Sequence, residues 1–260
     1  MIITLTTDYG TRDAYAGVLK GVILGLAPKV TVVDITHDIE PHNVRHGAFV
    51  LRQIWPWYPP GTIHVAVVDP GVGTERRILL GQYAGQFVIA TDNGLLTFLH
   101  RDFPTESAHV IEDRRFFSPS VSSTFHGRDI MAPVAAHLAN GAKPREFGRL
   151  ADHLELLPVA HRAEIHGDAL LGAVLYVDGF GTLVTNIRQE QLAAPRVHER
   201  EWQVTVNEIP LGALRSNYSE VSRGEALALL GSSGHLEIAV NQGRAVERFG
   251  PWDSVRVEVR

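Results

Sequence analysis

The sequence predicts an α/β domain with a largely parallel sheet at residues 1–158 and a smaller all-β domain, a barrel or a sandwich, at residues 165–260. Strand-like and helix-like segments alternate through the first part of the chain, with short connections between them. Short strand-like runs separated by turn residues then follow one another, and helical periodicity is weak there. A chain of 260 residues is long enough to form two cores.

The elements of the first domain follow from two periodicities. Runs of β-branched and apolar residues predict strands, and apolar residues three or four apart predict helices. The predicted strands cover residues 2–7, 30–36 and 62–69, and two short strands joined around Gly85 cover 76–92. The predicted helices cover residues 13–28, 43–59, 94–102 and 129–141. In sheets of this kind, ligands bind beyond the carboxyl ends of the strands.

The second domain is predicted from six strand-like runs that follow a connector at 148–168. These runs cover residues 170–178, 182–187, 201–209, 225–231, 235–241 and 253–259. Their short length and the turn residues between them are typical of a barrel or a sandwich.

Composition excludes several classes of function. The net charge of −5 argues against a protein that binds nucleic acid through phosphate contacts. The absence of cysteine excludes disulfides, thiolate catalysis and zinc–sulfur sites. No signal peptide and no apolar run long enough to span a membrane is evident, so we expect a cytoplasmic protein without a membrane partner.

Four aspartates each close a strand-like run, which predicts several acids on one edge of the sheet: Asp8, Asp34, Asp69 and Asp92. Asp8 lies in "TTDYG", just before a helix. One carboxylate can accept two hydrogen bonds from vicinal hydroxyls such as those of ribose. The alternative is that Asp8 caps the helix that follows.

The segment "DPGVGTERR" at 69–77 ends a buried strand in a tight turn. Pro70 fixes φ, and Gly71 and Gly73 permit turns that other residues resist. The turn can return Arg76 to Asp69. The segment is not a phosphate-binding loop of the Gly-Lys-Ser/Thr type, and the alternative is a surface turn whose arginines face solvent.

The segment "SSTFHGRDIMAPVAAHLANG" at 122–141 places His126 directly before a helix. A histidine there is a candidate acid, base or hydrogen-bond donor near neutral pH. Asp129 can cap the helix or pair with Arg128. No metal-binding motif such as H-E-x-x-H is present, so we expect no metal site.

Two turns of the second domain carry further candidates. In "DGFGTLVTNI" at 178–187, Asp178 can meet an ammonium group and Phe180 can stack on a flat base. In "LLGSSGHLEIAVNQGRA" at 229–245, Ser232 and Ser233 lie in a Gly-flanked turn, and backbone groups near Asn241 can read an adenine edge. The alternatives are a hairpin with a buried Phe and a plain β-turn.

Together, "TTDYG", "DPGVGTERR", "TFHGRDIMAPVAAHLA", "DGFGTLVTNI" and "GSSGHLEIAVNQG" occur in the order and spacing of one family. The chain resembles the S-adenosyl-L-methionine (SAM) hydroxide adenosyltransferases, or SAM hydrolases, over essentially its whole length. These are related to enzymes that make 5′-fluoro- and 5′-chloro-5′-deoxyadenosine. The resemblance implies a homotrimer whose active sites lie between the N-terminal domain of one subunit and the C-terminal domain of the next.

The resemblance also implies roles for individual residues. It assigns the catalytic set to Asp69, Arg76 and His126, and ribose binding to Asp8. It places Asp178 at the methionine amino group and Phe180 at the adenine. It places Ser232 and Ser233 near the methionine carboxylate.

The chain departs from the family pattern and from its halogenating relatives at three positions. Thr182 replaces an Asn that commonly contacts adenine, so those contacts are expected to differ. The halogenating relatives have Ser where this chain has Gly127, two residues after Phe125. They have Tyr or a polar residue where this chain has Asp69, whose carboxylate should repel a halide.

The sequence therefore predicts attack of water on C5′ of SAM, giving adenosine and methionine without a cofactor. Arg76 would orient Asp69, and either Asp69 or His126 would accept the proton. The alternatives are a halide-using 5′-chloro-5′-deoxyadenosine synthase, a non-catalytic adenosine- or SAM-binding protein and a metal-dependent hydrolase.

Overall fold

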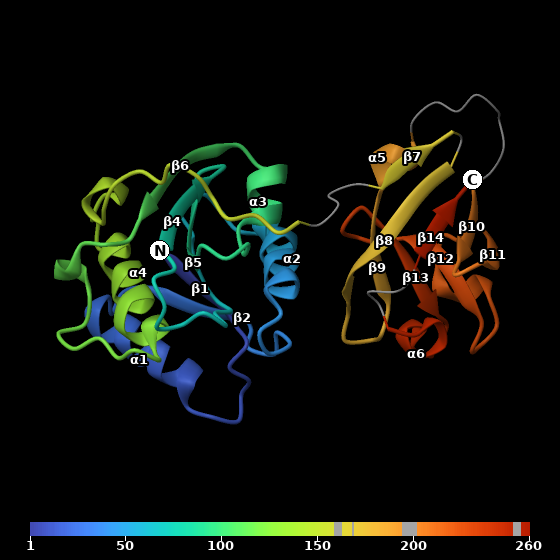
Figure 1. Ribbon diagram of the computed structural model, residues 1–260. Coiled ribbons are helices and arrows are strands. Elements are labelled where there is room, and N and C mark those ends of the chain that lie inside the picture. Colours follow the sequence, from blue (N-terminus) through green and yellow to red (C-terminus); the bar gives the residue numbers. More distant parts are fainter. Residues whose placement is uncertain (159–162, 168, 194–201, 252–255) are drawn as a thin grey trace. The chain divides into compact units, whose positions relative to one another are not determined.

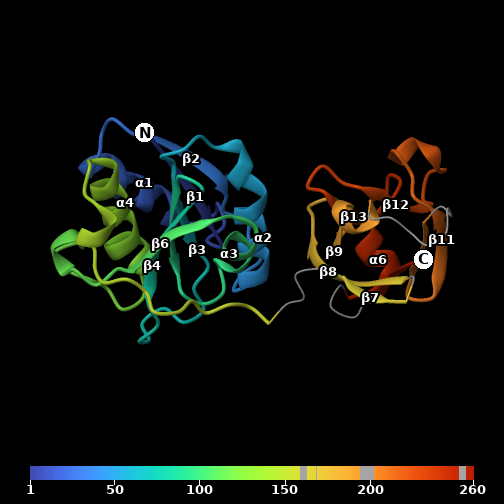
Figure 2. The same cartoon turned by 90° about the horizontal axis from the view of Figure 1, so that it is seen from above.

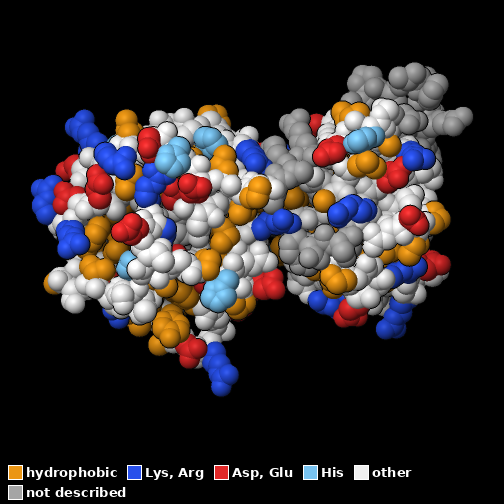
Figure 3. Space-filling model, viewed as in Figure 1, with side chains coloured by type: hydrophobic (Ala, Val, Ile, Leu, Met, Phe, Trp, Pro, Cys, Tyr) orange, Lys and Arg blue, Asp and Glu red, His pale blue; other side chains and the backbone are white. Residues whose placement is uncertain are grey.

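The computed structural model describes residues 1–158, 163–167, 169–193, 202–251 and 256–260. The chain divides into two compact units, Met1–Leu157 and Pro158–Arg260 (Figure 1). We describe each unit by itself. No helix among the described residues is long and apolar enough to cross a membrane. Acidic, basic and hydrophobic side chains are interspersed on the face of each unit that Figure 3 shows.

The N-terminal unit contains a six-stranded sheet in the order β2-β1-β3-β5-β4-β6. Its strands are β1 (Ile2–Thr7), β2 (Thr31–Thr36), β3 (Ile63–Val67), β4 (Ile78–Tyr83), β5 (Gln86–Thr91) and β6 (Thr105–Val110). The first four strands in this order pair in parallel, whereas β4 pairs antiparallel with both β5 and β6. The predicted largely parallel sheet is confirmed. Strand β6 was not predicted, because "TESAHV" is half polar and lies on the edge of the sheet.

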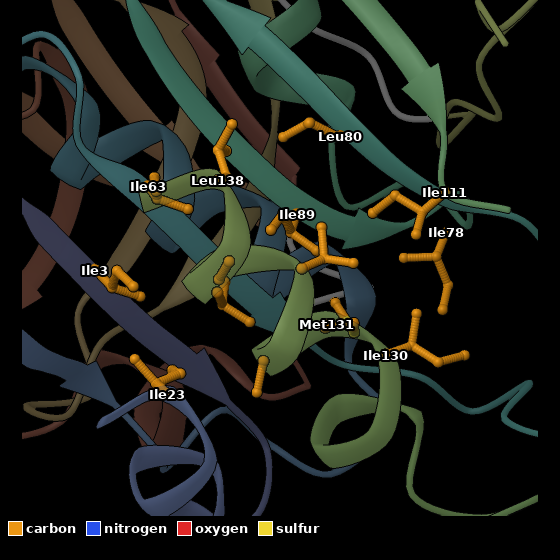
Figure 4. Close-up of a cluster of buried hydrophobic side chains, with 14 of the residues drawn as sticks. Ile3, Ile23, Ile63, Ile78, Leu80, Ile89, Ile111, Ile130, Met131 and Leu138 are labelled. Carbon is orange, nitrogen blue, oxygen red and sulfur yellow. The ribbon is translucent and has the colours of Figure 1, made fainter. Parts of the chain in front are cut away.

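Helices cover both faces of this sheet (Figures 1 and 2). The α-helices are α1 (Tyr15–Leu26), α2 (Val44–Ile54), α3 (Thr97–Asp102) and α4 (Ala132–Ala139), and a π-helical turn at Gly127–Met131 precedes α4. Short 3₁₀ turns lie at Trp55–Trp57, Arg114–Phe116 and Pro144–Glu146. Helices α1 and α4 pack together over one core, which includes Ile3, Ile23, Ile89 and Leu138 (Figure 4). Helices α2 and α3 pack together over a second core.

The C-terminal unit is an antiparallel, nearly closed barrel. Its strands are β7 (Glu164–His166), β8 (Ala169–Val177), β9 (Leu183–Arg188), β10 (Gln203–Val206), β11 (Ile209–Ala213), β12 (Ala226–Leu230), β13 (His235–Val240) and β14 (Arg256–Val259). Their order is β11-β10-β14-β8-β9-β13-β12, and β7 pairs with β8. The barrel nearly closes because Arg215, just beyond β11, donates its backbone N–H to the carbonyl of Ala228 in β12 at 2.8 Å.

The long strand β8 joins the two halves of the barrel. Its first part pairs with β14 and its second part with β9. The short helices α5 (Gln189–Leu192) and α6 (Ala245–Phe249) and a 3₁₀ turn at Tyr218–Glu220 complete the unit. Phe249 of α6 packs into the barrel core. The connector predicted at 148–168 is wrong in one part, because it contains β7.

Candidate active site

A cavity of about 260 Å³ lies at the carboxyl ends of β1 and β3 in the N-terminal unit. It is lined by Asp8, Tyr9, Tyr15, Pro41, His42, Val67, Asp69, Val72, Thr124, His126 and Gly127. Asp8 follows β1 directly, and Asp69 comes two residues after β3. His126 begins the π-helical turn that leads into α4. The structure thus brings together three predicted residues that are distant in the sequence, at the edge where parallel sheets bind ligands.

Asp69 and Arg76 form a buried ion pair beside this cavity. The Nε of Arg76 lies 3.1 Å from each carboxylate oxygen of Asp69, and Nη2 also donates to Oδ2. The aspartate and arginine side chains are only 6% and 12% exposed. The alternative of a turn with solvent-facing arginines is wrong for Arg76. The neighbouring Arg77 instead pairs with Asp92 at 2.6 Å and with Asp152.

Of the two glycines in this turn, only Gly73 has a positive φ, +84°. A Cβ on Gly73 would lie 2.7 Å from the carbonyl oxygen of Ser123, so the turn packs against the loop that carries His126. Gly71 is not among the glycines with a positive φ, so its backbone does not require glycine in the way that Gly73 does. The need for glycine is therefore clearest at Gly73, where both conformation and space demand it.

Asp8 faces the cavity and does not cap α1. The N-cap residue of that helix is Ala14, without a side-chain hydrogen bond, so the alternative interpretation of Asp8 is wrong. Its Oδ2 accepts the backbone N–H of His42 at 3.0 Å. Among the described residues Oδ1 has no hydrogen-bond partner, so it remains available to a ligand hydroxyl.

Three of the four predicted acids follow strands at one edge of the sheet: Asp8 after β1, Asp69 after β3 and Asp92 after β5. Asp8 and Asp69 line the cavity, but Asp34 lies inside β2, opposite Leu5, and does not follow it. Asp34 contacts Lys20 at 2.5 Å and His37 at 3.1 Å. Asp92 is held by Arg77. Asp34 and Asp92 therefore form ion pairs within the fold.

His126 lies in the cavity wall as a neutral imidazole. Burial lowers its pKa below the ordinary value, the positive charge of Arg76 adds to this, and Asp69 and Asp129 oppose it. Within the described part of the chain, neither ring nitrogen has a hydrogen-bond partner. Asp129 pairs with Arg128 at 2.6 Å and also accepts the N–H of Ser122, which fixes both ends of this loop.

A second cavity, of about 420 Å³, lies in the C-terminal unit. It is lined by Phe180, Thr182, Tyr218, Ala239, Val240, Gln242, Gly243 and Arg244. Phe180 is 82% exposed, so the alternative of a hairpin with a buried Phe is wrong. Gly181, beside it, has a φ of +84°, and a Cβ there would lie 2.8 Å from Cβ of Arg244. The turn thus presents an exposed aromatic ring above a pocket.

The remaining predicted residues of this unit do not line the second cavity. Oδ1 of Asp178 accepts the N–H groups of Phe180 and Thr182 at 2.9 and 2.8 Å, which shapes the hairpin. Ser232 and Ser233 lie in the turn between β12 and β13. The side chain of Asn241 donates to the carbonyl of Val221 at 2.8 Å. Ligand contacts of these residues stay predictions.

Sequence reasoning gave no role to several residues of the two cavities. Tyr9 lies in the motif "TTDYG" but has no local signal of its own. His42 and Tyr15 carry no local pattern that marks them either. Tyr218 and Arg244 reach the second cavity from a 3₁₀ turn and from a loop. Among the described residues no group of three or more His, Asp or Glu side chains is placed to hold a metal ion.

Comparison with known proteins identifies the family to which this chain belongs. The SAM hydroxide adenosyltransferase N-terminal domain matches residues 3–148, and the C-terminal domain of the same family matches residues 172–252. The chain belongs to the SAM hydroxide adenosyltransferase family. Both cavities lie on the matched segments, and the resemblance predicted from the five motifs is confirmed.

Individual relatives of this SAM hydroxide adenosyltransferase span nearly the whole chain. An (R)-S-adenosyl-L-methionine hydrolase of Salinispora tropica is 37% identical, over 98% of this chain and 97% of its own length. A crystal structure of an uncharacterised conserved protein from Thermotoga maritima has a TM-score of 0.90 and 35% identity, covering 100% of this chain and 99% of that one. A fluorinase of Actinopolyspora mzabensis is more distant, at 28% identity over 99% of this chain and 96% of its own.

Proposed function

We propose that this enzyme hydrolyses SAM to adenosine and L-methionine by attack of water at C5′. The observation that carries the proposal is the cavity in which Asp8, Asp69 and His126 converge, with Arg76 paired to Asp69 behind it. The hydrolases at 37% identity support the same reaction. The fluorinases are the more distant relatives, which favours water over a halide.

The reaction needs little chemistry beyond placement. The oxygen of water forms a bond to C5′ while the C5′–S bond breaks. The electron pair of the C5′–S bond stays on sulfur. Methionine leaves as a neutral thioether and needs no proton. We propose that no cofactor takes part, because SAM supplies its own activated leaving group. The enzyme supplies a poorly solvated, correctly aimed water and a path for its proton.

We assign the proton to His126 and the orientation of the water to Asp69. The carboxylate of Asp69 is engaged by Arg76 through both oxygens, and each oxygen can still accept a hydrogen bond from water. His126 is neutral, because burial and Arg76 lower its pKa, and its ring has no competing partner among the described residues. A neutral imidazole near an attacking water can act as a general base and accept its proton.

We propose that residues of both units bind the adenosine and methionine parts of the substrate. Asp8 offers a free carboxylate oxygen for the ribose hydroxyls. Phe180 offers an exposed ring for stacking on adenine, with Thr182 in place of an amide beside it. As the family resemblance implies, the units come from neighbouring copies of a homotrimer. An isolated N-terminal unit is then expected to be inactive.

The relatives' names suggest which form of SAM is the substrate. They specify the (R) form of SAM. The two epimers at sulfur exchange the places of the methyl and methionyl groups around the same C5′–S bond. A site that aligns water with this bond while holding the methionine end can accept only one of them well. We propose the (R) epimer for this chain as well.

Product analysis tests the proposal. The full-length protein is incubated with each SAM epimer, with and without chloride and a chelator, and the products are separated by chromatography. Adenosine and methionine in equal amounts, beyond one per site and unaffected by the chelator, support hydrolysis. 5′-Chloro-5′-deoxyadenosine would instead reveal a halide-using enzyme. Bound adenosine without turnover would reveal a binding protein, and loss of turnover with the chelator would reveal metal dependence.

A histidine variant tests the proton path. If His126 is the base, His126→Asn should lower kcat strongly at neutral pH, by about 10²- to 10⁴-fold. The lowered pKa places the acidic limb of the wild-type profile below pH 6.5. A variant that keeps both its rate and this limb would move the assignment to Asp69.

A further inference from the structure

The Tyr9 hydroxyl lies deep in the catalytic cavity of the N-terminal unit. A Cβ built on Gly127 would lie 2.5 Å from this oxygen, so the hydroxyl occupies the space beside the backbone that follows His126. Tyr9 lines the same cavity as Asp69 and His126. Its oxygen therefore lies near both groups to which the attacking water has been assigned.

The tyrosine ring is fixed by its neighbours. It packs against Tyr15 with ring centroids 5.5 Å apart and edge-on against Phe125 at 5.8 Å. These two rings also contact each other edge-on at 5.4 Å. Three mutually packed aromatic rings leave Tyr9 little freedom to turn away from the cavity.

A chain of polar contacts fixes the backbone of the same residue. The N–H of Tyr9 donates to Oγ1 of Thr7 at 3.2 Å, and this hydroxyl contacts Nδ1 of buried His37 at 2.8 Å. The other ring nitrogen of His37 lies 3.1 Å from Asp34, which Lys20 contacts in turn. The direction of the Tyr9 side chain is thus set from both its ring and its backbone.

The hydroxyl itself has no hydrogen-bond partner among the described residues, and Tyr9 lines the cavity, so the O–H can donate to a molecule bound there. Burial, followed by the negative charges of Asp8 and Asp69, raises the pKa of Tyr9 above its ordinary value. The phenol is therefore protonated at neutral pH. It is a neutral donor aimed into the cavity.

We propose that Tyr9 is a further catalytic residue, whose O–H donates a hydrogen bond to the oxygen of the attacking water. A water molecule has two hydrogens and two lone pairs. If Asp69 and His126 take the hydrogens and Tyr9 takes one lone pair, the remaining lone pair is fixed in direction toward C5′. This inference rests on the proposed hydrolysis of SAM.

Orientation of this kind changes the rate of the chemical step and leaves binding of the nucleoside unchanged. Tyr9→Phe keeps the ring and its packing and removes only the donor. We expect its kcat to fall by about 10- to 100-fold, because the attacking water loses one of the contacts that hold it in line with the C5′–S bond. The KM for SAM and the affinity for adenosine are expected to stay within about twofold.

Tyr83→Phe is the matched control. Tyr83 is fully buried in the core under α2 and α3, and its hydroxyl is also without a partner among the described residues. The same atom is removed from the same unit, away from the cavity. We expect its turnover to equal that of the wild type.

The measurements are kcat and KM with SAM, adenosine affinity by calorimetry, and thermal unfolding of the full-length wild type and both variants. A selective fall of kcat in Tyr9→Phe supports the proposal. Unchanged turnover in Tyr9→Phe, or a raised KM with kcat intact, overturns the role of Tyr9 while hydrolysis stands. A wild-type protein that binds adenosine but does not hydrolyse SAM overturns both.

Discussion

Replacing Arg76 with alanine is expected to destabilise the N-terminal unit, because the largely shielded Asp69 carboxylate would lose the one cation paired with it among the described residues. The two side chains are 12% and 6% exposed, and the guanidinium reaches both carboxylate oxygens. Removing one member of such a buried pair costs about 3–5 kcal/mol. Replacing both residues with alanine leaves no buried charge, so the double variant should regain about 2 kcal/mol or more of that loss.

The assay is a double-mutant cycle in urea at pH 7, with unfolding followed by circular dichroism and tryptophan fluorescence. Arg115→Ala is the control, because Arg115 pairs with Asp113 while 79% exposed, and solvent screening should make its loss almost neutral. A coupling energy below about 1 kcal/mol between Arg76 and Asp69 would refute the reasoning. The pair would then behave as a solvated one, and its role in orienting water would lose its structural basis.

Three other predictions concern single residues. Burial lowers the pKa of His64 to about 4, so the neutral imidazole stabilises the fold above pH 6.5. About 3 kcal/mol of the free energy of unfolding is lost as the pH falls from 6.5 toward 4. His64→Gln should lose this pH dependence in urea titrations. Gly127→Ala should destabilise by about 1–3 kcal/mol in thermal unfolding, and adding Tyr9→Phe should relieve most of this; no relief would show that the contact is not limiting. Phe180→Ala should weaken adenosine binding in calorimetry by about 1–3 kcal/mol without changing the melting temperature, and unchanged binding would remove the stacking role.

The sequence was most informative where a motif is local. The turn from Asp69 to Arg76 and the loop at His126 were predicted because Pro and Gly positions constrain the backbone directly. The alternation of strands and helices gave the fold class, because hydrophobic periodicity is also a local signal. The sequence did not decide between a barrel and a sandwich for the second domain. Closure of the barrel depends on the approach of β11 to β12, which has no local signature.

What could not be predicted depends on tertiary contacts. Asp34 resembles a strand-end acid in the sequence, but its register opposite Leu5 and its contact with Lys20 place it in an ion pair away from the cavity. Tyr9 carries no pattern of its own, and its proposed role follows from its place in the cavity wall and from its hydroxyl beside Gly127. Tyr218 likewise reaches the second cavity only through the fold of the barrel.

The charges around the catalytic cavity suggest why Arg76 is placed behind Asp69 and not in the cavity. The sulfonium of SAM is positive before the reaction, and this charge disappears as the C5′–S bond breaks. A free carboxylate beside it would stabilise the substrate more than the transition state and would lower the rate. Pairing with Arg76 cancels the charge of Asp69 while leaving its oxygens in place. In the proposed mechanism the pair orients water without holding the cation, and the rate then depends on placement of the nucleophile by Asp69, His126 and Tyr9.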